Sequence, residues 1–182
     1  MEILTYDSAN LLNEGYKVLI NRKKCMIYSE ADLPFICAPR KGVVDEQLCY
    51  DLGYRVYEML HGGGVIVVEP GDIDIAHFGD NDNTFRHEFA TDFAKWLRSN
   101  GLNPIYEDND ILVDGYKVCG IGMRRHGDID YTTIHIGINT NLEHIKLICK
   151  KPMNKVPKGL SEYGITTEEV EAWFLDFAER NQ

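Results

Sequence analysis

The pair Asp114-Gly115 lies between two apolar, β-branched runs, Ile111–Val113 and Tyr116–Ile121. An Asp-Gly pair in that position favours a two-residue β-hairpin turn. A hairpin joins antiparallel neighbours, whereas parallel strands need a long crossover connection. The chain is therefore expected to contain a mixed or antiparallel sheet, and a doubly wound parallel fold is disfavoured.

Two helices have clear signals elsewhere in the sequence. One is predicted from about Asn83 to Asn100, because Phe85, Phe89, Phe93 and Leu97 recur at every fourth position and form one apolar stripe. The other is predicted to open at Thr166, where Thr166 and Glu169 have the spacing of a capping box. The remaining predicted elements are strands at Ile3–Tyr6, Pro34–Ala38, Arg55–Leu60, Val65–Val68, Ile73–Phe78, near Ile105 and at Tyr131–Ile138, and helices after Ser8 and at Val43–Leu52 and Asn141–Cys149.

The fold class that follows is α+β, with a mixed, largely antiparallel sheet flanked by helices. The chain has 182 residues, and no linker or repeat divides it, so residues 1–182 are expected to form a single domain. Hydrophobic residues make up 44% of the chain and charged residues 26%, a balance that excludes a disordered or collagen-like chain.

Charge and composition exclude several classes of partner. The formal net charge is −10, which disfavours binding to nucleic acid, because contact with phosphates needs clusters of Lys and Arg. The longest apolar run, Gly64–Val68, is far shorter than the roughly 20 residues that span a membrane. The five cysteines are an odd number without a C-x-x-C pair, and the first residues lack a signal-peptide pattern. Reduced thiols and a cytoplasmic location are expected.

The run His61-Gly62-Gly63-Gly64 is the most unusual local feature. Consecutive glycines cost conformational entropy on folding, so the fold needs a reason for them. One reason is the close approach of a ligand to bare backbone, and the alternative is a tight turn or bulge. His61 is the one histidine singled out, because it adjoins these glycines.

A second candidate site follows the hairpin turn. Lys117 lies in a largely apolar strand, where a lysine can face an anionic ligand, although exposure to solvent is the commoner arrangement. Asn109-Asp110 could supply oxygen ligands to Mg²⁺ or serve only as turn residues. Gly120 removes a side chain from one face of the same strand.

Taken in order, these motifs resemble the biotin/lipoate protein ligase superfamily, in particular lipoate–protein ligases and octanoyltransferases. The most specific similarity is Asn109–Gly120, which resembles the ligase pattern N-D-[ILV]-x-V-x-G-x-K-[IV]-[SA]-G. Gly62–Val65 followed by Pro70–Ile73 is similar to the glycine run and the turn of the family. The resemblance covers roughly Pro34–Thr166, most of the chain.

The resemblance implies an enzyme that activates a carboxylic acid, such as lipoate or octanoate, with ATP and Mg²⁺ and transfers it to a lysine of a lipoyl or biotinyl carrier domain. Such ligases often use an additional small domain, which an accessory protein chain could supply. Lys117 would be the catalytic residue that holds the carboxylate, and Asp110 would bind the metal. The implied substrate-binding or adenylate-binding residues are His61, Gly62, Gly63, Gly64, Asn109 and Gly120.

Several positions depart from the family pattern, among them Val67-Val68-Glu69, which stands where the family has Tyr-His-Asp. Glu58 and Met59 stand where ligases carry an arginine pair, and Lys158 stands where octanoyltransferases carry a nucleophilic cysteine. A lysine cannot form a thioester intermediate, so a divergent octanoyltransferase would need another cysteine. A non-catalytic ligand-binding or regulatory module on the same fold is the second alternative, and the sequence leaves turnover open.

Overall fold

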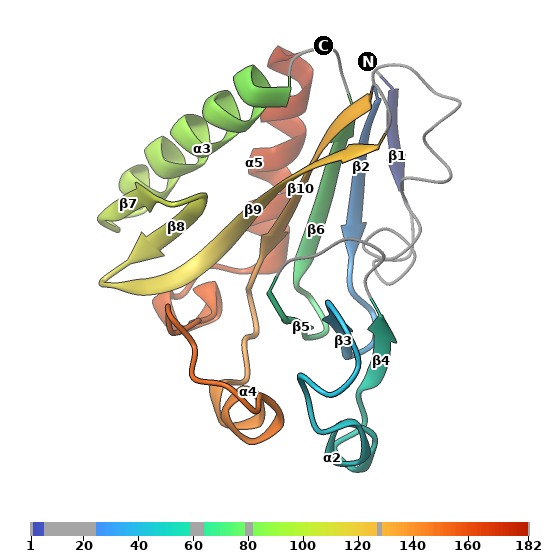
Figure 1. The fold of residues 1–182 in the computed structure, drawn as a ribbon. Helices are drawn as coiled ribbons and strands as arrows, with labels where there is room; N and C mark the ends of the chain where they lie inside the picture. Colours follow the sequence, from blue (N-terminus) through green and yellow to red (C-terminus); the bar gives the residue numbers. More distant parts are fainter. Residues whose placement is uncertain (1, 6–24, 59–63, 79–81, 127–128, 182) are drawn as a thin grey trace.

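The computed structural model describes residues 2–5, 25–58, 64–78, 82–126 and 129–181. Within these residues the chain forms two sheets, shown in Figure 1. The larger sheet has seven strands in the order β1-β2-β6-β10-β9-β8-β7, and the smaller has three in the order β4-β3-β5. The α+β class expected from the sequence is confirmed.

The large sheet is antiparallel except at one edge. Only β1 and β2 pair in parallel; every other neighbouring pair is antiparallel. The mixed, largely antiparallel arrangement that the hairpin signal predicted is therefore present. Its strands are β1 (Glu2–Thr5), β2 (Cys25–Glu30), β6 (Ile73–Phe78), β7 (Pro104–Glu107), β8 (Asp110–Val113), β9 (Tyr116–His126) and β10 (Ile129–Ile136).

The small sheet lies beside the lower end of the large one in Figure 1, with two short helices next to it. Its central strand pairs in parallel with one neighbour and antiparallel with the other. The strands are β3 (Phe35–Ala38), β4 (Arg55–Glu58) and β5 (Ile66–Val68), and the short helices are α2 (Glu46–Asp51) and α4 (Leu142–Ile148).

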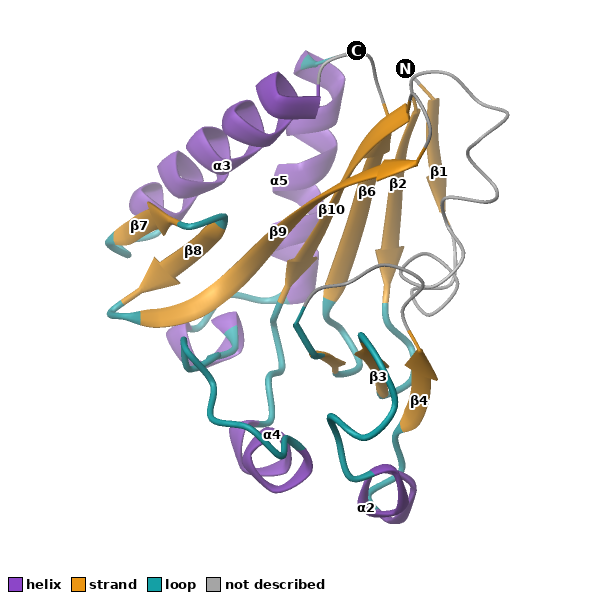
Figure 2. Cartoon of the chain, in the orientation of Figure 1, coloured by secondary structure: helices purple, strands orange, loops and turns teal. Residues whose placement is uncertain are grey.

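Two long helices, α3 (Asp82–Ser99) and α5 (Thr167–Arg180), cover one face of the large sheet, as Figure 2 shows. The predicted aromatic stripe of α3 is buried against α5: Phe89 and Phe93 are fully buried, and the Phe93 ring centroid lies 4.6 Å from that of Trp173. The capping box at Thr166 is present, with both of its hydrogen bonds formed. Neither these helices nor the other described ones are long and apolar enough to cross a bilayer.

The predicted hairpin turn is confirmed. Asp114 and Gly115 have φ angles of 52° and 81°, the left-handed conformation that a two-residue turn between β8 and β9 requires. A second turn of this kind, which the sequence analysis missed, joins β7 to β8 through Asp108 and Asn109, whose φ angles are 50° and 67°.

Other boundaries differ from the predictions. The helix predicted over Val43–Leu52 begins later, after Asp45, whose side chain caps it. Strand β2 was not predicted at all. Five of its six residues are buried, so it lacks the alternation that marks a half-buried strand. The helix predicted after Ser8 lies outside the described residues.

A buried carboxylate joins the two sheets. Asp72 is fully buried in the turn before β6, and its Oδ1 accepts hydrogen bonds from the backbone N–H groups of Ile138 at 2.6 Å and Asn139 at 2.9 Å. Its Oδ2 accepts one from the N–H of Glu69 at 2.9 Å. The segment that leaves β5 is therefore tied to the segment that leaves β10. The second of these segments contains Gly137 and Thr140, which line a cavity between the two sheets.

Candidate active site

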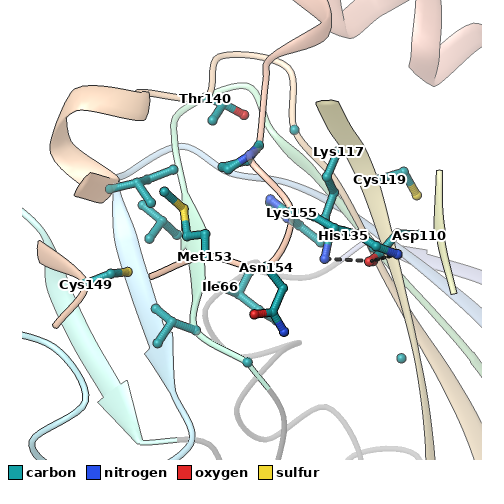
Figure 3. A pocket seen from close by; sticks show the side chains of 18 of the residues that line it. Ile66, Asp110, Lys117, Cys119, His135, Thr140, Cys149, Met153, Asn154 and Lys155 are labelled. Atoms are coloured by element: carbon teal, nitrogen blue, oxygen red, sulfur yellow. Dashed lines mark ion pairs between the residues drawn. The ribbon is translucent and has the colours of Figure 1, made fainter. Parts of the chain in front are cut away.

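A cavity of about 1090 Å³ lies between the large sheet and the small one. Its walls come from β9 and β10, from residues 64–67 at β5, and from residues 151–157 after α4. Figure 3 shows part of its lining. The volume is slightly above the range of about 300–1,000 Å³ that small-molecule sites commonly occupy.

The two ends of the cavity differ in polarity. In Figure 3, Lys117, Asp110, His135 and Lys155 lie together on one side, and Ile66, Met153 and Cys149 lie on the other. The rest of the lining adds further cations and aliphatic side chains, namely Arg40, Lys151, Val43, Val67 and Ile145. A ligand with an anionic head and an apolar chain would match this division.

Lys117 lies at the centre of the polar end. Its Nζ is 2.8 Å from Oδ1 of Asp110, and 36% of its side chain is exposed. Lys155 approaches the other oxygen of the same carboxylate, with its Nζ 3.1 Å from Oδ2 of Asp110 and 2.9 Å from the backbone carbonyl oxygen of Glu107. One carboxylate thus holds two ammonium groups beside the cavity.

A bulge in β9 places Lys117 on this side of the sheet. Ile111 pairs with Cys119, but the next residue of β8, Leu112, pairs with Lys117, so Val118 is an extra residue in β9. In a regular strand, Lys117 and Gly120 are three residues apart and would point to opposite faces. The extra residue restores a common face, and the end of the Lys117 side chain lies over Gly120.

Gly120 is required by this packing. A Cβ atom at position 120 would lie 2.8 Å from Nζ and 2.9 Å from Cε of Lys117, and 3.6 Å from Oδ1 of Asp110. Distances under about 3 Å from a Cβ are not tolerated, so any side chain at this position would displace the lysine. The glycine leaves the room in which the Lys117–Asp110 ion pair forms.

His135 on β10 is a further polar group in the cavity wall. Its Nδ1 is 2.9 Å from Oδ1 of Asp74, and its Nε2 is 3.8 Å from Oδ2 of Asp72. Burial opposes protonation of the ring, but the charge and hydrogen bond of Asp74 and the charge of Asp72 outweigh it, so the pKa of His135 is raised above its ordinary value.

Two cysteines line the cavity, one at each end. Cys119 is buried, and Cys149 at the apolar end is partly exposed. Burial raises the pKa of both thiols, which disfavours the nucleophilic thiolate form. Lys158, at the position that the resemblance matches to the octanoyltransferase cysteine, lies outside the cavity lining, with its Nζ 4.2 Å from the centroid of the Tyr163 ring.

Four of the residues predicted from the sequence come together here: Lys117, Asp110, Gly120 and Gly64 all line the cavity. Asn109 does not. It lies in the β7–β8 turn, where its Oδ1 accepts a hydrogen bond from Nη1 of Arg86 at 2.7 Å.

The predictions for His61, Gly62 and Gly63 lie outside the described residues, so they stay predictions. Sequence analysis missed two residues of the polar end, Lys155 and His135. Lys155 lies in a segment without regular structure, and His135 reads in sequence as an ordinary strand residue, so neither carries a local signal.

The described residues around Asp110 do not by themselves form a metal centre. Both oxygens of Asp110 already contact ammonium groups, which disfavours a further cation at that carboxylate. Among the residues whose placement is described, no group of three or more acidic, His or Cys side chains could hold an ion. The metal-binding role predicted for Asp110 gains no support from this geometry.

Comparison with known proteins agrees with the fold and with the motif order. Residues 38–172 match the family model of the lipoyl protein ligase A/B catalytic domain. An octanoyltransferase from Caldicellulosiruptor saccharolyticus is 25% identical over 186 residues, a match that covers 93% of this chain and 76% of that protein.

Two solved structures share the fold at low sequence identity. A bi-partite lipoate protein ligase from Thermoplasma acidophilum, studied with its E2 lipoyl domain, superposes with a TM-score of 0.77 at 13% identity over 96% of this chain and 80% of that one. A lipoate-protein ligase A bound with ATP superposes with a TM-score of 0.76 at 14% identity over 97% and 83%. The matched segment is most of the chain and contains the cavity residues from Gly64 to Pro157, and on that basis this protein belongs to the lipoyl protein ligase A/B family, within the biotin/lipoate ligase superfamily.

Proposed function

We propose that this chain activates a small carboxylic acid, such as lipoate or octanoate, with ATP and transfers the acyl group to a lysine of a carrier domain. The observation that carries the proposal is the position of Lys117, whose ammonium group lies at the polar end of a cavity with an apolar far end. The ATP-bound relative with the same fold supports the choice of nucleotide.

The proposed reaction has two steps, activation of the acid and transfer of the acyl group. The carboxylate oxygen of the acid attacks the α-phosphorus of ATP, the bond from that phosphorus to the bridging oxygen breaks, and pyrophosphate leaves. The amine of the carrier lysine then attacks the acyl carbon, releases AMP, and loses a proton. Lys117 stabilises the negative charge on the oxygens in both steps, with Lys155, Arg40 and Lys151 adding positive charge around the phosphates.

Octanoyl transfer through a cysteine is the second candidate, because the octanoyltransferase homologue belongs to the same family. Cys149 favours it, since this thiol lines the cavity and is partly exposed. Against it, burial raises the pKa of the Cys149 thiol, and the family's cysteine position is occupied by Lys158. The ATP-dependent route needs neither a reactive Cys149 thiolate nor a cysteine at position 158.

The carrier and the location are part of the same proposal. A lipoyl domain is the preferred acceptor, because the two-part relative was studied with its E2 lipoyl domain, and an accessory chain would be the counterpart of its second part. The proposed location is a reducing, cytoplasmic compartment, which the odd number of cysteines without a C-x-x-C pair supports.

The test is native mass spectrometry of the purified protein with ATP, Mg²⁺ and lipoate, octanoate or biotin in separate mixtures. We expect an acyl-adenylate adduct with one of these acids, together with release of pyrophosphate. A protein that binds an acid without turnover would instead be the non-catalytic module. An acyl thioester that maps to Cys149 after incubation with an acylated carrier, without ATP, would establish the transferase.

Substitution of Gly120 tests the placement of Lys117. In Gly120→Ala the new methyl group displaces the lysine ammonium, and a misplacement of about 1 Å can cost about 10²-fold in rate. We expect a large fall in pyrophosphate release at little cost in thermal stability, since only the end of a flexible side chain must move. The matched control is Met123→Ala, a substitution on the same strand at an exposed residue outside the cavity lining. Equal activity of the two variants would contradict this placement.

A further inference from the structure

His135 is part of a row of polar residues that crosses several strands of the large sheet. In the strand ladders, Asp74 of β6 lies opposite His135 of β10, His135 lies opposite Gly120 of β9, and Gly120 lies opposite Asp110 of β8. Directly opposed residues project to the same face of a sheet. The row therefore places a carboxylate, an imidazole, an open position and a second carboxylate on four neighbouring strands, in that order, on one face of the sheet.

The open position in that row is filled by Lys117, whose Nζ lies over Gly120. No side chain of β9 separates the imidazole of His135 from this ammonium group, because the residue between them in the ladder is a glycine. The two groups are also coupled electrically, since the charge of Lys117 lowers the pKa of His135. Both line the cavity, and Figure 3 shows them at its polar end.

The carboxylates behind His135 are buried. Asp74 and Asp72 are fully buried, whereas 18% of the His135 side chain remains exposed. Buried carboxylates are costly unless a positive charge or hydrogen bonds compensate them. A protonated imidazole with Nδ1 directed at Asp74 supplies such a charge, and Nε2 is held 3.8 Å from Asp72, too far for a strong hydrogen bond.

The charged groups that face His135 are thus Asp74 on β6, Asp72 in the turn before β6, and Lys117 on β9. The first two favour the imidazolium, and the third opposes it. An anion bound between His135 and Lys117 would remove that repulsion and attract both cations. Binding of an anion at this point should therefore be coupled to protonation of His135.

We propose that His135, as an imidazolium, is a second cation beside Lys117 for the carboxylate head group of the bound acid. The inference rests on the proposed function in taking a carboxylic acid as the ligand, but it concerns the binding of the free acid and needs no ATP. His135 lines the cavity and attracts the head group through its positive charge, while Asp74 acts through His135 as a positioning residue. The apolar chain of the acid then extends toward Ile66 and Met153.

The experiment is titration calorimetry of octanoate and, separately, of lipoate, without ATP, from about pH 6 to about pH 9. These carboxylic acids, with pKa values of about 4 to 5, stay ionised throughout this range. As the pH rises through the pKa of His135, the imidazolium loses its proton. The dissociation constant of the wild-type protein should then increase by up to tenfold per pH unit.

The decisive variant is His135→Gln, which keeps a hydrogen-bond donor but cannot be protonated. We expect binding about tenfold to 100-fold weaker at the acidic end, in line with loss of one attractive charge beside the bound carboxylate, and an affinity that no longer depends on pH. The matched control is His144→Gln on α4, where the histidine Nδ1 is 2.9 Å from the Tyr54 hydroxyl oxygen outside the cavity lining. That variant should keep the wild-type pH profile.

Two further measurements test the protonation of His135 independently of the His135→Gln variant. Asp74→Asn should shift the pH profile to lower pH, because the imidazolium loses its partner. If His135→Gln does not fold, NMR titration of the wild-type imidazole should show its pKa rise when octanoate is added. An unchanged profile in His135→Gln, an imidazole pKa that octanoate does not move, or failure of both acids to bind would overturn the inference. Binding of an acid without adenylate formation would overturn only the proposed function.

Discussion

Lys117→Ala is expected to lose pyrophosphate release by about 10²-fold to 10³-fold while the protein stays folded. The magnitude is that of removing one preorganised donor from the site where charge develops in a transition state. Lys117 is the cation that the β9 bulge directs over Gly120, and Lys155 approaches from a separate segment. A neighbouring lysine therefore does not replace it in position.

The fold should tolerate this change. The Lys117 side chain is 36% exposed and ends in an ion pair with the partly exposed Asp110, so its removal costs little unfolding free energy. The matched control is Lys158→Ala, which removes a lysine that packs over Tyr163 outside the cavity. The rate of pyrophosphate release and the melting temperature are measured for both. A Lys117→Ala protein with wild-type rate would show that the reactive carboxylate binds elsewhere.

Asp72→Ala is expected to lower the free energy of unfolding by about 3–5 kcal/mol. Three donors at about 1–3 kcal/mol each would give about 3–9 kcal/mol, and the lower part of that range applies because two of the three hydrogen bonds are only partly buried. The donors that lose their acceptor are the N–H groups of Glu69, Ile138 and Asn139. Domains of this size have a total stability of about 5–15 kcal/mol, so the variant should be close to unfolding.

Denaturant unfolding followed by circular dichroism measures this loss. Asp176→Ala is the control, since Asp176 is exposed and pairs on the surface with Arg180, a type of ion pair worth about 0–1 kcal/mol. Asp72→Asn should lie between the two, because the amide retains one accepting oxygen. A loss of less than about 1 kcal/mol in Asp72→Ala would mean that the three N–H groups find other acceptors.

Local signals in the sequence determined much of the fold. The Asp114-Gly115 turn, the aromatic stripe of α3 and the capping box of α5 each depend on residues a few positions apart, and each was predicted. Strand β2 was missed because it lies between β1 and β6 with both faces covered, so its buried residues show no alternation. Burial on both faces depends on distant strands, which local periodicity does not report.

The candidate site also contains some residues that local sequence signals predicted and others that they did not. Asp110, Lys117 and Gly120 lie within one short segment, so their common chemistry was visible in the sequence, although the bulge that puts them on one face was not. Lys155 and His135 reach the same place from other parts of the chain. His135 is brought there by the pairing of β9 with β10, and Lys155 by the segment that hydrogen-bonds to the backbone of Lys117. Neither of these long-range pairings can be predicted from the spacing of residues in the sequence.

The bulge at Val118 also determines which substitutions, insertions and deletions during evolution would leave this site intact. The single extra residue between Lys117 and Cys119 decides which face of the sheet carries the ammonium group. Replacing Val118 with another apolar residue keeps the number of residues in the bulge. Deleting or inserting one residue there would move the Lys117 side chain to the opposite face of the sheet. The side chain at position 118 should thus vary among apolar residues that fit the core, while the length of the segment stays fixed.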